Sequence, residues 1–67
     1  MDKKISIILS TYNEAAIIEE SINKIFNTIK NVEIVVVDDN STDGTLKILN
    51  SIKNKNLKVY SRKSRGL

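Results

Sequence analysis

Two adjacent carboxylates, Asp38 and Asp39, follow an unbroken run of β-branched residues at Ile34–Val37. Such a run predicts a strand that is buried on both faces, and in open α/β sheets ligands bind outside the carboxyl ends of the strands. Neighbouring carboxylates repel each other there unless a ligand or a hydrogen-bond donor is held beside them. The pair therefore predicts a binding site in which Asp39 accepts from ribose hydroxyl or base N–H groups. Three roles stay open for Asp38: helix cap, ligand contact or stabiliser of the turn.

A second group of polar side chains completes this candidate site. Tyr12 can pack its ring on a nucleobase, and Glu14 can accept from base N–H or ribose hydroxyl groups. Near the end of the chain, Arg62 and Arg65 are suited to contact a diphosphate, because guanidinium groups bind phosphate oxygens in pairs. Together with Asp39, these residue types predict a pocket for a nucleotide diphosphate.

Three of the acidic and aromatic residues also have a purely structural interpretation. Tyr12 can simply cover the edge of a sheet. Glu14 and Asp43 can each be a negative charge in the first turn of a helix, where the helix dipole favours it. The sequence alone leaves these alternatives open.

Composition limits the chemistry that the chain can carry. The 67 residues contain no Cys and no His, which excludes disulfides and thiolate metal sites and removes the commonest general base near neutral pH. No apolar run approaches the roughly 18 residues of a membrane span, and no signal peptide is recognisable, so a cytoplasmic location is expected. The net charge is +3, with only basic charges after Asp43. This basic end lacks an aromatic platform or recognition helix, so no nucleic-acid partner is expected.

The spacing of apolar residues predicts five elements around these side chains. They are a strand at Lys4–Ser10, a helix that begins at Glu14 and carries an apolar stripe up to Ile29, a strand at Val32–Asp38, a helix from Thr45 to about Lys53 and a strand at Leu57–Tyr60. Asn13 is predicted to cap the first helix. The fold class is α/β, with a β-α-β-α-β order that is half of a Rossmann-like parallel sheet.

This predicted fold leaves one face of its sheet uncovered. Right-handed crossovers place both helices on the same face if the strands advance in one direction. Parallel sheets are normally covered on both faces. Residues 1–67 are therefore expected to form a single partial domain, the N-terminal part of a larger one. The alternative is a stand-alone interaction module of the same topology, which pairs its bare face or edge with a partner and has no catalytic activity.

Two common α/β sites do not fit the loops of this chain. A dinucleotide site needs a Gly-rich turn after the first strand, and Ser10–Glu14 contains no Gly. A phosphoacceptor site of the receiver-domain kind needs a separate aspartate at the end of the third strand, where this chain has Tyr60, Ser61 and Arg62. The interpretation that remains is a site that recognises a nucleotide without a Gly-rich turn.

Two stretches at the predicted strand-to-helix junctions resemble a known family. They are Ile7–Glu14, with the sequence IILSTYNE, and Ile34–Thr45, with the sequence IVVVDDNSTDGT. In this order they closely resemble the opening of the family 2 glycosyltransferases, which have the GT-A fold, and the resemblance covers the whole chain. The ending Arg62–Leu67, RKSRGL, is similar to a basic segment of the dolichyl-phosphate mannose synthase branch.

The resemblance implies an inverting transfer of a sugar from a nucleotide-diphosphate donor to an acceptor hydroxyl. It implies that Tyr12 and Glu14 line the nucleotide pocket and that Asp39 hydrogen-bonds the base or ribose. Ser10 stands where the family usually has Pro, which loosens the turn but removes no polar contact, so Ser10 is counted with the nucleotide-binding residues.

The resemblance also implies a divalent metal, Mg²⁺ or Mn²⁺, that neutralises the diphosphate leaving group. The family's metal-binding Asp-x-Asp and its catalytic base are expected downstream. No metal ligand and no catalytic residue is therefore predicted within the chain, and the segment alone is expected to be inactive. The expected acceptor is a polyprenyl phosphate or a glycan, and association with the cytoplasmic face of a membrane is expected only through further C-terminal parts.

Overall fold

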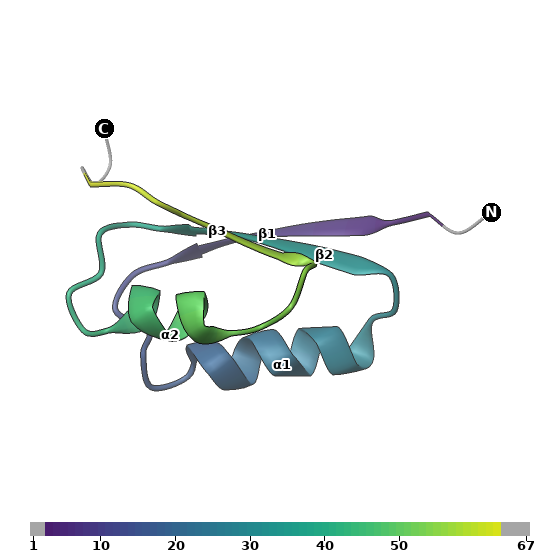
Figure 1. Ribbon diagram of the computed structural model, residues 1–67, viewed down its shortest axis with the longest axis horizontal. Helices are drawn as coiled ribbons and strands as arrows, with labels where there is room; N and C mark the ends of the chain where they lie inside the picture. Colours follow the sequence, from purple (N-terminus) through teal and green to yellow (C-terminus); the bar gives the residue numbers. More distant parts are fainter. Residues whose placement is uncertain (1–2, 64–67) are drawn as a thin grey trace.

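The elements alternate between strand and helix along the chain, as predicted. The computed structural model describes residues 3–63. In chain order the elements are β1 (Ile5–Thr11), α1 (Ile18–Thr28), β2 (Val32–Asp38), α2 (Thr45–Ser51) and β3 (Leu57–Ser61) (Figure 1). The predicted α/β class and the bounds of the second strand are confirmed.

The strands form one parallel sheet with β2 in the centre. The sheet has three strands in the order β1-β2-β3. The register places Thr11 beside Asp38 and Asp38 beside Ser61, so the last residues of the three strands lie in one row. The loops that follow β1, β2 and β3 therefore begin side by side at one edge of the sheet.

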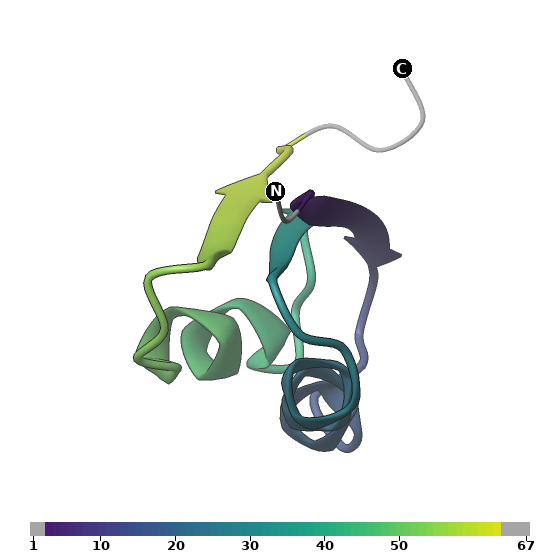
Figure 2. The same ribbon diagram turned by 90° about the vertical axis from the view of Figure 1, so that its right-hand side faces the viewer.

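Both helices lie on the same face of the sheet, which Figure 2 shows end-on. Alternate residues of β2 point toward them and are buried, while Val35 and Val37 on the other face are only half-buried. On the bare face, 72% of Ile8 and 57% of Tyr60 are exposed. The predicted uncovered face is confirmed for the described residues, whereas the predicted burial of Ile34–Val37 on both faces was wrong: the run is buried on the helix side only.

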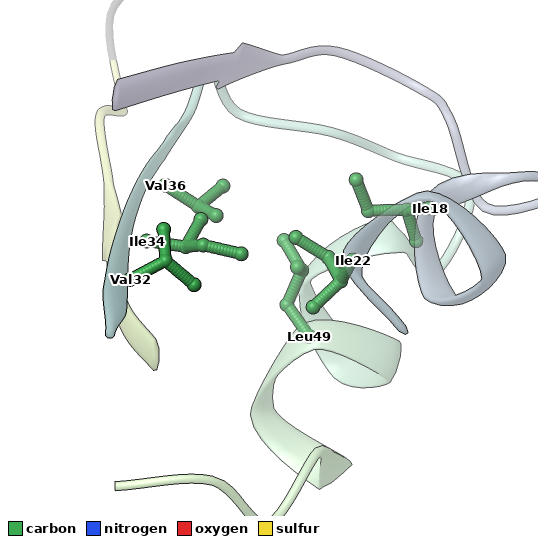
Figure 3. Close-up of a cluster of buried hydrophobic side chains, with 6 residues drawn as sticks. All are labelled: Ile18, Ile22, Val32, Ile34, Val36 and Leu49. Atoms are coloured by element: carbon green, nitrogen blue, oxygen red, sulfur yellow. The ribbon is translucent and has the colours of Figure 1, made fainter. Parts of the chain in front are cut away.

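A small apolar core joins the two layers. It consists of side chains from α1, β2 and α2 that point toward one another (Figure 3): Ile18, Ile22, Val32, Ile34, Val36 and Leu49. Each is at most 3% exposed, and apolar residues of β1 and β3 pack around them. Among residues 3–63 no helix is long and apolar enough to cross a membrane.

The first helix begins later than its apolar stripe predicted. Helix α1 starts at Ile18, four residues after Glu14, and its N-cap residue is Ile17 without a side-chain cap hydrogen bond. Asn13 was predicted as the cap, but its φ of 52° is left-handed, and its Oδ1 accepts from the Thr42 backbone N–H at 2.8 Å. The prediction was wrong because the Asn13 side chain accepts from the backbone of the loop after β2 and does not cap the helix.

The remaining differences are at element ends. Helix α2 ends at Ser51 because Ile52 has an extended backbone, two residues before the predicted end at Lys53. Strands β1 and β3 each extend one residue beyond their predicted ends, to Thr11 and Ser61.

Candidate functional site

The predicted site residues Tyr12, Asp39 and Arg62 each follow the last residue of a strand. The sheet ladder continues for one more backbone hydrogen bond past the strand ends. The Asp39 N–H donates to the Thr11 carbonyl at 2.8 Å, and the Arg62 N–H donates to the Asp38 carbonyl at 2.8 Å. The backbones of the second and third loops therefore leave the sheet in fixed positions.

The structure brings two predicted residues into direct contact. A terminal guanidinium nitrogen of Arg62 lies 3.6 Å from Asp39 Oδ1, and the two side chains are 46% and 19% exposed. A guanidinium has five N–H donors, more than one carboxylate oxygen accepts. Arg62 can therefore stay beside Asp39 while it presents other donors to an anion at the same edge.

The other predicted residues differ in exposure and in position. Tyr12 is 40% exposed and Glu14 is half-buried. Ser10 is exposed on β1, beside Val37, and shares its face of the sheet with Ile8. Arg65 lies outside the described residues.

Asp38 stabilises the turn, which decides among its three open roles. The side chain is fully buried. Its Oδ1 accepts from the Thr11 and Ser41 hydroxyls at 2.7 and 2.6 Å, and its Oδ2 accepts from the Ser41 N–H at 2.9 Å. Burial raises the pKa of Asp38, but these hydrogen bonds outweigh it and hold the pKa below its ordinary value. Asp38 thus faces its own loop and not the solvent at the edge.

Asp43 stands before α2, as predicted for a charge at a helix N-terminus, but it also bridges to the first loop. Its Oδ1 accepts from the Thr45 N–H at 3.0 Å and from the Thr45 hydroxyl. Its Oδ2 accepts from the Ala15 N–H at 3.1 Å. The hydrogen bond from the Thr45 hydroxyl is the main cause that lowers the pKa of Asp43, and burial opposes it.

Three side chains, Ser41, Asp43 and Thr45, accept from backbone N–H groups of the loop after β1, and Asp38 holds the Ser41 hydroxyl in place. We name this set, Asp38, Ser41, Asp43 and Thr45, the loop clamp. Sequence reasoning identified Asp38 and Asp43 but missed the hydroxyl residues. The sequence spacing Asp-x-x-Ser-x-Asp-x-Thr could have indicated these contacts, because carboxylates and hydroxyls alternate between the end of β2 and the start of α2.

Two open hollows in the surface lie elsewhere. They have volumes of about 620 and 330 Å³ and follow α1, with Lys24 and Thr28 lining both. None of their lining residues is a predicted site residue. Among the predicted site residues, the described part of the chain brings Asp39 and Arg62 into contact at the edge where the strands end.

The sequence of the chain is similar to those of known proteins. The chain is 44% identical over 62 residues to an uncharacterized glycosyltransferase of Haemophilus influenzae, covering 88% of this chain and 19% of that protein. It is 43% identical over 68 residues to a dolichol-phosphate mannosyltransferase of Pyrococcus furiosus, covering 96% and 19%. It is 37% identical over 70 residues to a cholesterol galactosyltransferase of Borreliella burgdorferi, again covering 96% and 19%.

The chain spans about a fifth of the length of these curated relatives. The family model for glycosyl transferase family 2 matches residues 6–67, which is nearly the whole sequence. The resemblance read from the two loop motifs is confirmed, and a dolichol-phosphate mannosyltransferase is among the relatives. The chain belongs to glycosyl transferase family 2.

Proposed function

We propose that the edge at the strand ends is the nucleoside-binding part of a glycosyltransferase donor site. The donor is a nucleotide-diphosphate sugar, and the reaction is an inverting transfer of the sugar to an acceptor hydroxyl. The observation that carries the proposal is that Tyr12, Asp39 and Arg62 directly follow three adjacent parallel strands, with the last two in contact. Ligands of open α/β sheets bind at such an edge.

Each residue has a role that its chemistry supports. Tyr12 offers a partly exposed ring for stacking on the base. Glu14 and Asp39 accept hydrogen bonds from the base or the ribose, and Ser10 adds a hydroxyl at the end of β1. Arg62 contacts the diphosphate from its place beside Asp39. Arg65 is proposed to add a second guanidinium there.

The metal requires residues other than the described ones. Among residues 3–63 no three Asp, Glu, His or Cys side chains come together as a cluster that could hold a metal ion. The described residues therefore do not fit a complete site for Mg²⁺ or Mn²⁺. Our proposal assigns the metal ligands and the catalytic base to residues outside this range.

For the acceptor we propose a polyprenyl phosphate or a glycan. Dolichol phosphate and cholesterol appear in the names of two relatives, and another relative, from Campylobacter jejuni, is named as a glucosyltransferase of a glycan linked to undecaprenol diphosphate. A lipid-linked acceptor would be reached at the cytoplasmic face of a membrane, which is the location proposed for that case.

Replacing Asp39 with alanine tests the donor site. Asp39→Ala is expected to weaken binding of a nucleoside diphosphate about 10- to 100-fold, because a hydrogen bond to a charged group contributes about 1.5–3 kcal/mol. Titration calorimetry of the full-length protein with UDP, GDP, ADP and CDP measures the change. Because the Arg62 side chain is 46% exposed, solvent screens its pair with the half-buried Asp39, and loss of this pair is expected to change the free energy of unfolding by about 1 kcal/mol or less.

The matched control removes a carboxylate on α1. Glu20 is exposed in the first turn of that helix, so Glu20→Ala is expected to leave nucleotide binding unchanged. Either of two results contradicts the proposal: the natural protein binds none of the four nucleotides, or Asp39→Ala binds as tightly as the natural protein.

A further inference from the structure

The loop between β1 and α1 is held by side chains of another loop. Its consecutive backbone N–H groups at residues 13, 14 and 15 donate to the Ser41 hydroxyl at 2.8 Å, the Thr45 hydroxyl at 2.8 Å and the Asp43 carboxylate at 3.1 Å. These acceptors lie 28 to 31 residues away in the sequence. The loop that carries Tyr12 and Glu14 is therefore shaped by the loop clamp as well as by its own sequence.

The clamp fixes the direction of each hydroxyl. A hydroxyl has one proton to donate, and an ionised carboxylate can only accept. The Thr45 hydroxyl donates to Asp43, so its oxygen lone pairs face the Glu14 N–H. In the same way, the Ser41 hydroxyl donates to Asp38 and accepts from the Asn13 N–H. Each carboxylate thereby turns a hydroxyl into an acceptor for one backbone N–H of the first loop.

Thr45 is the central member of this arrangement for Glu14. It is fully buried at the start of α2, so it cannot itself reach a ligand in solution. The Asn13 side chain reinforces the contact from the other direction, because its Oδ1 accepts from the Thr42 N–H at 2.8 Å. The two loops are thus joined by hydrogen bonds in both directions, and movement of one requires movement of the other.

We propose that Thr45 is a positioning residue for the donor nucleotide, acting by fixing the Glu14 backbone and with it the side chains of Tyr12 and Glu14. The inference rests on the proposed function, because it assigns those two side chains to the nucleotide. Binding groups that are held in place before the ligand arrives bind more tightly, since less conformational freedom is lost on binding. The Thr45 hydroxyl supplies this order without touching the ligand.

Two substitutions of the same residue separate the hydroxyl from the methyl group. Thr45→Val keeps the shape but removes the acceptor, and it is expected to weaken nucleoside diphosphate binding about tenfold. Thr45→Ser keeps the hydroxyl and is expected to bind within about twofold of the natural protein. Titration calorimetry of the full-length protein with UDP, GDP, ADP and CDP gives the affinities. Amide hydrogen exchange at Glu14 is expected to be faster in Thr45→Val only.

A control makes the same change elsewhere. Thr28→Val alters an exposed residue at the end of α1 and is expected to change neither affinity nor exchange at Glu14. If Thr45→Val does not fold, Asp43→Asn replaces it. Asp43 is exposed, and its carboxylate directs the Thr45 hydroxyl and accepts from Ala15, so Asp43→Asn is expected to weaken binding in the same direction.

The outcomes distinguish this inference from the function on which it rests. If the natural protein binds no nucleoside diphosphate, the proposed function fails and the inference fails with it. If the natural protein binds but folded Thr45→Val, or Asp43→Asn in its place, keeps full affinity, only the positioning role of Thr45 is overturned. If Thr45→Ser loses as much affinity as Thr45→Val, packing of the methyl group is responsible and the inference is again overturned.

Discussion

At the residue scale, Asp38 shows how the fold keeps a fully buried carboxylate charged. Its two oxygens accept three hydrogen bonds, from Thr11 and from the Ser41 hydroxyl and N–H. These donors stabilise the ionised form more than burial disfavours it, so the pKa is lower in the folded protein than in the unfolded chain. A group with a lowered folded pKa contributes stability that is present above its unfolded pKa and is lost as the pH falls through the folded value.

The free energy of unfolding is therefore expected to fall as the pH drops below the ordinary Asp value of 3.8. Asp38→Asn is expected to lower this free energy by about 1–3 kcal/mol at neutral pH, because an amide nitrogen cannot accept from the Ser41 N–H. The same substitution removes one source of the acid sensitivity. Urea unfolding of both proteins at about pH 7 and about pH 3 measures the two effects. Equal stability of the two proteins at neutral pH would contradict the role of Asp38.

The sequence predicted some of the site residues better than others. Asp39 and Arg62 come directly after strands, so their place at the edge follows from strand order alone. The partners of Ser41 and Thr45 could not be predicted, because Ser and Thr are common turn and cap residues and their hydrogen bonds here cross to a loop about thirty residues earlier. Only the register of β1 against β2 places those backbone groups within reach.

At the scale of elements, the start of α1 departed furthest from its sequence pattern, whereas α2 starts at Thr45 as predicted. Strand β2 has its predicted bounds because its β-branched residues and its position in the sheet favour the same conformation. A turn already begins at Glu14, whose carbonyl accepts from the Ile17 and Ile18 N–H groups, but the regular helix α1 starts only after Ile17, whose φ of −126° is not helical. Asn residues take left-handed backbone angles at positions 13, 31 and 40, a conformation that Asn tolerates better than most residues.

Gly44 gives a test of backbone conformation that is separate from packing. It precedes α2 with a φ of 95°, and a Cβ added there would meet no atom within 4 Å. Gly44→Ala is therefore expected to cost about 1–2 kcal/mol through the left-handed backbone alone. Gly44→Asn is expected to cost less, because Asn adopts positive φ more readily. Urea unfolding midpoints measure both variants, and equal stability of Gly44→Ala and the natural chain would rule out the backbone explanation.

At the scale of the whole molecule, the sheet has two unlike faces. The face toward the helices carries the core residues of β2, whereas the other exposes Ile8 and Tyr60 and leaves Val35 and Val37 half-buried. The handedness of strand crossovers predicted this asymmetry, since it places successive helices on one side. Figure 2 shows the resulting pair of layers, with both helices on the same side of the sheet.

One conservative change, placed once on each face, measures this asymmetry. Ile34 is fully buried in β2 and Ile8 is 72% exposed in β1, and Ile→Val preserves strand propensity at both positions. In the 67-residue chain, Ile34→Val is expected to lower the free energy of unfolding by about 0.5–1.5 kcal/mol, because it removes a buried methylene group. Ile8→Val is expected to change it by less than about 0.5 kcal/mol, because the lost group lies in solvent. Equal losses in urea unfolding would contradict the exposure of Ile8 and would mean that the outer face of β1 is covered in solution.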